Sequence, residues 1–177
     1  MKKIIYFLLV LLLIGGCIML ANELLINRPV KTKIQADPRN KGIALDAHYR
    51  SYVLPQVLVL NLTGIEGSHS PLDVFRTVLQ ASQALKDKEF KEVFLACKGT
   101  NKFKLPGAYF KELGTTYDSQ NPLYTVRTFP ANVLNLDGTP AYGKLEGGIL
   151  GVFNAGMEQF TDLSKKWYTN ELFNNPQ

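Results

Sequence analysis

The sequence predicts a single small α/β domain with a three- to five-stranded, largely parallel sheet, flanking helices and a long C-terminal helix. Apolar strand-like runs alternate along the chain with helix-like apolar stripes, which is the pattern of α/β proteins. Setting aside the first 44 of the 177 residues leaves about 130, close to the commonest domain size. We therefore expect one globular domain over residues 45–177.

The chain begins with a segment typical of membrane targeting. Lys2 and Lys3 precede an apolar run from Ile4 to Ile14, and two glycines and Cys17 follow. A short cationic start, an apolar stretch and small residues before a cleavage point form the layout of a secretory signal.

The ending Ile14-Gly15-Gly16-Cys17 resembles the lipobox of bacterial lipoproteins, in which an aliphatic residue and two small residues precede a cysteine that receives diacylglycerol. The resemblance implies that residues 1–16 are a signal peptide and that Cys17 is both the lipid attachment site and the mature N-terminus. The domain then lies outside the cytoplasm, in the periplasm of a Gram-negative cell. The resemblance covers the signal alone and implies nothing about the domain.

An uncleaved transmembrane helix is the alternative. The chain stays apolar after Cys17, and Ile4–Ala21 has the eighteen residues that are the lower limit for crossing a bilayer core of ~30 Å. Basic residues lie on both sides of this stretch, so charge does not decide between the two hypotheses. Both place the domain at a membrane.

Residues 17–44 are expected to form the lipidated N-terminus and a polar tether. From Asn22 to Ala44 the chain is largely polar, is interrupted by Pro29 and Pro38, and carries more basic than acidic residues. Proline interrupts regular structure, so a solvated spacer is the interpretation that we adopt.

A strand–helix–strand unit opens the domain. Residues 57–62 are nearly all apolar and β-rich, which predicts a strand covered on both faces. Ser70, followed by a proline and an aspartate, predicts a helix start, and residues 93–96 predict a second buried strand. A crossover of this length predicts a parallel, right-handed pair.

The later elements are predicted from shorter patterns. Residues 106–113 resemble a helix closed by a glycine, and residues 123–129 alternate as a strand does. Residues 133–136 predict another strand that turns at Asp137-Gly138. From Gly148 to Leu172, apolar residues recur every three or four positions, which predicts a long helix facing the core.

Residues 57–102 resemble the strand–helix–strand unit of the signal-peptide-peptidase and ClpP-like fold. The resemblance is carried by Val-Leu-Val-Leu-Asn-Leu-Thr-Gly, Ser-Pro-Leu-Asp-Val and Lys-Asp-Lys-Glu-Phe-Lys-Glu-Val-Phe-Leu. Those enzymes follow the second strand with a glycine-rich serine-peptidase signature, whereas residues 98–102 of this chain contain no serine. The resemblance thus implies a relative without the catalytic Ser–Lys pair, used for binding.

Few residues offer site chemistry. The chain has two histidines, His48 and His69, and apart from Cys17 its one cysteine is Cys97, which lies in an apolar run. This composition predicts no metal site, and no dinucleotide or phosphate-loop motif indicates a cofactor. Without the two lysines of the targeting segment, 18 basic and 15 acidic residues leave a charge of +3. That surplus is too small to indicate nucleic acid.

One loop is a candidate ligand site. It runs from Gly64 to Ser70, between the carboxyl end of a strand and the start of a helix, where α/β sheets bind ligands and helix N-termini attract anions. Glu66 and His69 have the chemistry of an acid–base pair. Alternatively, glycines shape the turn, Ser70 caps the helix, and Glu66 and His69 are simply exposed.

Three hypotheses for function remain open. The absence of a catalytic constellation favours a non-catalytic cell-envelope protein that binds a partner protein or assists an assembly. The alternatives are a hydrolase with degenerate motifs and a carrier of small molecules or lipids.

Overall fold

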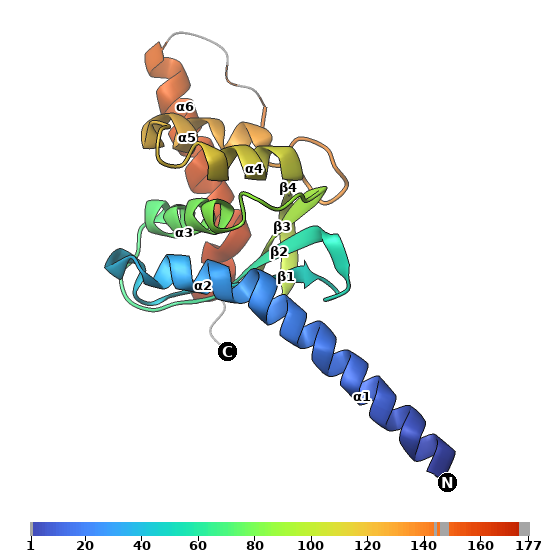
Figure 1. Ribbon diagram of the computed structural model, residues 1–177. Coiled ribbons are helices and arrows are strands. Elements are labelled where there is room, and N and C mark those ends of the chain that lie inside the picture. Colours follow the sequence, from blue (N-terminus) through green and yellow to red (C-terminus); the bar gives the residue numbers. More distant parts are fainter. Residues whose placement is uncertain (1, 144, 146–148, 174–177) are drawn as a thin grey trace.

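The structure of the protein is a computed structural model that describes residues 2–143, 145 and 149–173. A four-stranded sheet in the order β1-β2-β3-β4 is covered on one side by helices, and the N-terminal helix projects from the domain (Figure 1). The fold is thus mixed α/β, as the sequence predicts. The strands are β1 Ile43–Arg50, β2 Leu54–Ile65, β3 Glu92–Cys97 and β4 Thr100–Pro106.

The prediction of a largely parallel sheet is wrong. Only β2 and β3 pair in parallel, while β1 pairs with β2 and β4 pairs with β3 in antiparallel fashion. The reason is the length of the connections, because two or three residues can join only antiparallel strands. The turns are residues 51–53 and 98–99. The β1 and β4 strands were not anticipated.

The strand–helix–strand unit is confirmed. Helix α3 (Pro71–Ala84) connects the parallel strands β2 and β3. The Ser70 hydroxyl accepts a hydrogen bond from the Asp73 backbone N–H at 3.3 Å, and the Asp73 carboxylate accepts one from the Ser70 N–H at 2.8 Å. This capping box satisfies two backbone donors that the helix leaves unpaired, so the helix starts where the sequence predicts.

The segment predicted as a strand at residues 123–129 is instead helix α5 (Pro122–Thr128). The Asn121 side-chain oxygen accepts the Leu123 N–H at 2.9 Å, and a proline occupies the first helical position, where its missing N–H costs nothing. Helix α4 (Gly107–Thr115) confirms the helix predicted before it. The predicted strand at 133–136 is reduced to isolated bridges at Leu134, with η3 (Pro130–Asn132) before it.

The C-terminal helical region also differs from the single long helix that was predicted. It consists of α6 (Ile149–Ser164), a π-helical turn η4 (Lys165–Thr169) and α7 (Asn170–Phe173). The predicted first residue, Gly148, lies outside the described residues. The π-turn changes the helical phase, and both Trp167 and Tyr168 within it are buried.

The longest helical run is at the N-terminus and replaces the predicted tether. Elements α1 (Lys2–Asn22), η1 (Glu23–Asn27) and α2 (Arg28–Gln35) form one 34-residue helix, after which comes the short η2 (Pro38–Asn40). Pro29 does not end it. A proline ring clashes with the carbonyl four residues earlier, here Leu25, and the π-turn η1 widens the helix at that residue.

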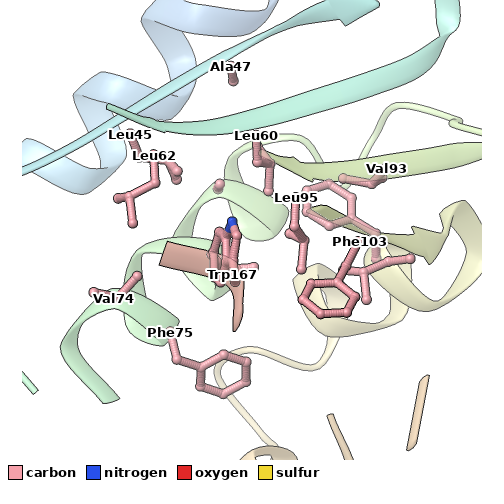
Figure 2. Close-up of a cluster of buried hydrophobic side chains, with 14 of the residues drawn as sticks. Leu45, Ala47, Leu60, Leu62, Val74, Phe75, Val93, Leu95, Phe103 and Trp167 are labelled. Atoms are coloured by element: carbon pink, nitrogen blue, oxygen red, sulfur yellow. The ribbon is translucent and has the colours of Figure 1, made fainter. Parts of the chain in front are cut away.

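A single apolar core joins the helices to one face of the sheet. Figure 2 shows Trp167 between strand side chains such as Leu60 and Leu95 and the α3 residue Phe75. The Trp167 indole N–H also donates to the Ala96 carbonyl oxygen at 3.1 Å, which satisfies its polar atom inside the core. The opposite face of the sheet has only a small cluster built from strand residues.

Candidate functional site

The face of the sheet away from the helices carries mostly polar side chains around a small apolar centre. Val59 and Phe94 are neighbours across β2 and β3, and each is 5% exposed. The Arg50 guanidinium lies over the Phe94 ring, 4.9 Å from its centroid. At the other side, Lys104 pairs with Glu92 at 2.7 Å. Because charged side chains cover the apolar centre, this face is suited to contact with water or with a polar partner.

The N-terminal helix forms one wall beside this face. Its attachment depends on two asparagines that accept hydrogen bonds from the outer edge of β1. The Asn22 Oδ1 accepts from the Tyr49 N–H at 2.9 Å, and the Asn27 Oδ1 accepts from the Ala47 N–H at 3.1 Å. An edge strand presents such unpaired donors, and here side chains from the helix satisfy them.

The π-turn explains how both asparagines reach the same strand. In a regular α-helix, residues five apart point ~140° away from one another. The i→i+5 bonding of a π-turn brings them close to one face. Asn22 and Asn27 flank η1, and the donors that they meet are two residues apart on β1. The local widening thus allows the helix to follow the strand.

Between this helix and the open face lies a cleft of about 540 Å³. We call it the edge cleft. Its lining combines two carboxylates, one ammonium, one imidazole, three amides and a phenol with apolar residues from the end of α1. The lining residues are Met19, Leu20, Asn22, Glu23, Asn27, Lys31, Asp46, Ala47, His48, Tyr52 and Asn61.

Several groups in the edge cleft are held by their neighbours. The Lys31 ammonium lies 2.7 Å from the Asp46 carboxylate, and both side chains are about two-fifths exposed. The His48 ring stacks on the Tyr52 ring with centroids 4.7 Å apart, and His48 Nδ1 lies 2.9 Å from the Tyr49 carbonyl oxygen. These contacts fix the side chains in place and leave their outer edges facing the cleft.

This lining carries polar and aromatic groups of the kind that recognise a ligand. It contains neither serine nor cysteine, so no nucleophile of the usual kind stands beside His48. Within the part of the chain that the structure describes, no group of three or more His, Cys, Asp or Glu residues could hold a metal ion. The lining offers hydrogen bonding, ion pairing and ring stacking, which suit a polar ligand or peptide, together with the acid–base groups Glu23, Asp46 and His48.

The predicted ligand loop lies elsewhere, at the opposite end of β2. Ser70 is used as the α3 cap, and the His69 Nε2 lies 2.9 Å from the Lys41 carbonyl oxygen. The Glu66 N–H donates to the Gly42 carbonyl oxygen at 2.7 Å, while its side chain is exposed. The structure therefore joins His69 to Lys41 rather than to Glu66. Ligand binding by this loop stays a prediction.

The two cysteines have opposite surroundings. Cys17 is exposed on α1, whereas Cys97 is buried at the end of β3. Burial, with a smaller contribution from the nearby Glu171 carboxylate, raises the pKa of the Cys97 thiol to about 11. Because the thiolate is the reactive form, Cys97 is unsuited to act as a nucleophile.

A second cavity, of about 390 Å³, lies among the helices α3, α4 and α5. Most of its wall is apolar, and the basic residues Arg39 and Arg76 lie at its border. Its apolar lining residues are Leu72, Phe75, Leu79, Leu113, Pro122, Leu123 and Val126.

The chain matches no known family model, and no curated protein or solved structure is significantly similar to it. We therefore infer function from the geometry of the chain itself. Sequence reasoning missed the edge cleft, although a signal was present. Residues 43–50 alternate apolar and polar side chains, which places Asp46 and His48 together on one face of a strand.

Proposed function

We propose that this protein is a membrane-anchored, extracytoplasmic binding module that holds the edge cleft and the open sheet face directly at the membrane surface. The observation that carries the proposal is the burial of Asn22, which is 3% exposed. The Asn22 side chain forms hydrogen bonds with the domain at the residue where the apolar helix ends. The anchor and the domain are therefore joined without a flexible linker.

The outer part of α1 supports the proposed location at a membrane. It is exposed and apolar on all sides, and the helix contains a window long and apolar enough to cross a membrane. A signal sequence and a permanent anchor share this length and composition. The Gly-Gly-Cys ending favours a cleaved lipoprotein signal.

Lipidation at Cys17 is the finer part of the proposal. Cys17 and the buried Asn22 are five positions apart, which is ~7.5 Å of helix. A diacylglyceryl group on this thiol therefore holds the domain against the headgroups. Two or three acyl chains give stable attachment, whereas one alone binds only marginally.

The test compares wild-type protein with Cys17→Ser in a bacterial host. Thioether lipidation needs the sulfur, so the wild-type protein should lack residues 1–16 and incorporate labelled palmitate, and the variant should do neither. Mass spectrometry of the mature N-terminus is the decisive measurement. A wild-type protein that keeps Met1 and takes up no label would contradict lipidation and leave a transmembrane helix as the anchor.

The binding role is tested at the edge cleft. A photo-crosslinking amino acid at Asn61, which lines the cleft, should capture a defined envelope component in intact cells. The same amino acid at Leu136, an exposed residue outside the cleft, serves as the matched control. Equal capture from both positions, or capture from neither, would argue against recognition by the cleft.

A carrier of small molecules is the second candidate, because the cavity among α3, α4 and α5 combines an apolar wall with two arginines. That pattern suits a ligand with an apolar body and an anionic group. Mass spectrometry of ligands extracted from the purified protein would identify such a cargo. A hydrolase gains no support from the edge cleft or from Cys97, and probes for serine or cysteine nucleophiles should leave the protein unlabelled.

A further inference from the structure

The turn between β1 and β2 carries three consecutive exposed apolar side chains. Tyr52, Val53 and Leu54 are 41%, 56% and 47% exposed. We call these residues the hairpin tip. Single exposed apolar residues are normal on protein surfaces, but a run of three at a projecting turn marks a surface that another apolar phase covers.

The position of the hairpin tip is fixed relative to the anchor. The Asn22 side-chain N–H donates to the Tyr52 carbonyl oxygen at 2.7 Å, so the tip lies beside the residue at which α1 leaves the domain (Figure 1). Ser51 and Tyr52 both have the left-handed backbone conformation, with φ of 51° and 62°. The Tyr52 N–H donates to the Tyr49 carbonyl oxygen at 2.8 Å, which closes this tight turn.

Both kinds of anchor bring this turn close to the membrane surface. A transmembrane helix over Ile4–Ala21 leaves the bilayer core at Asn22, and acyl chains on Cys17 lie ~7.5 Å of helix away from Asn22. The hairpin tip is bonded to Asn22 in either case. Tyrosine is enriched at the membrane interface because its ring is apolar and its hydroxyl is polar.

We propose, on the basis of the function proposed above, that the hairpin tip inserts into the interfacial layer of the leaflet that holds the anchor. The occupant of this surface is lipid, because Tyr52 lines the same cleft as Met19 and Leu20, exposed apolar residues at the end of α1 that both kinds of anchor retain. The two contacts, anchor and tip, fix the rotation of the domain about the helix axis. The edge cleft, which Tyr52 and Leu20 both line, then opens at the level of the headgroups.

The test places a tryptophan at the tip of the full-length protein. The mature protein, extracted from cell membranes, is reconstituted as Val53→Trp in phosphatidylcholine vesicles with or without brominated acyl chains. The chain has one native tryptophan, Trp167, which is only 3% exposed, so wild-type protein provides the background. Leu136→Trp is the matched control because Leu136 is 48% exposed and lies beside β4, at the edge of the sheet opposite β1.

Brominated lipid should remove about half of the emission that Val53→Trp adds, since interfacial side chains reach ~5–10 Å into the headgroup and acyl boundary. Leu136→Trp should lose none of its added emission. A Val53→Trp protein that sediments with vesicles but is not quenched overturns the lipid contact and leaves the anchor intact. Protein that does not sediment overturns both proposals. If the tryptophan at position 53 is shielded from solvent in native membranes but not in protein-free vesicles, a protein partner covers the hairpin tip. That result overturns the lipid contact.

Discussion

The two halves of the N-terminal helix have the same secondary structure but opposite surroundings. From Ile4 to Leu20 the large apolar side chains, apart from the half-buried Ile18, are about half exposed or more, whereas Ile26, Val30 and Ile34 in the second half are almost fully buried. The first half is apolar on every side, and the second has one apolar stripe at intervals of four. An all-round apolar helix needs lipid, and a striped helix needs a protein core. The first half therefore has the composition of a membrane anchor or signal sequence, the second half has that of a core helix, and Asn22 marks the boundary.

The largest expected effect comes from the buried half. Ile26→Ala removes a fully buried side chain and leaves a cavity between the helix and the domain, so we expect a loss of about 2–5 kcal/mol in the free energy of unfolding. Met19→Ala, at a residue 57% exposed that both kinds of anchor retain, is the matched control and should leave domain stability unchanged. Urea unfolding in mild detergent measures both. Equal losses of unfolding free energy in the two variants would contradict the difference between the two halves.

A smaller effect is expected at the boundary itself. Asn22→Ala leaves the Tyr49 N–H without its partner, and a buried donor that loses its partner costs about 1–3 kcal/mol. Asn27→Ala removes one comparable hydrogen bond, from the Ala47 N–H. Because Asn27 is less buried than Asn22, this variant should lose less free energy of unfolding. Amide hydrogen exchange at Tyr49 and Ala47 should accelerate separately in the two variants. Unchanged exchange in both would show that the asparagines do not hold the strand edge.

The smallest expected effect is on the pH dependence of stability. It comes from Asp37, which lies just after the N-terminal helix. Hydrogen bonds from the Arg39 guanidinium hold the pKa of the Asp37 carboxyl well below its usual value of 3.8. A lowered pKa stabilises the folded state above the unfolded value, and this contribution is lost as the pH falls from about 4 toward the folded-state pKa. Asp37→Asn should therefore unfold with a shallower acid dependence below about pH 4. Identical slopes for the two proteins would contradict this assignment.

The sequence predicts the central part of the fold because its signals are local. The capping residues at Ser70 and the apolar runs of β2 and β3 each specify one element without help from distant residues. The edge strands were missed although β4 alternates Phe103 and Leu105 with lysines. Their pairing depends on short turns, and the left-handed turn at Ser51 and Tyr52 lacks the glycine that normally indicates one.

The N-terminal helix and the edge cleft could not be predicted for a different reason. Pro29 would be expected to end the helix, but the π-turn η1 accommodates it. Nothing in the local sequence indicates that turn. The cleft requires the helix and β1 to lie side by side, which depends on the long-range bonds of Asn22 and Asn27. Asp46 and His48 were therefore not recognised as candidate site residues, while Glu66 and His69 were chosen from the position of their loop and from their acid–base chemistry.

The central claim is that no flexible tether separates the anchor from the domain. Hydrogen exchange of the full-length protein in detergent or vesicles tests it directly, through peptides that cover residues 27–35. A helix packed through Val30 and Ile34 should exchange as slowly as β2, because its amides open only when the domain opens. Exchange of these amides within seconds, as in a solvated spacer, would contradict the account.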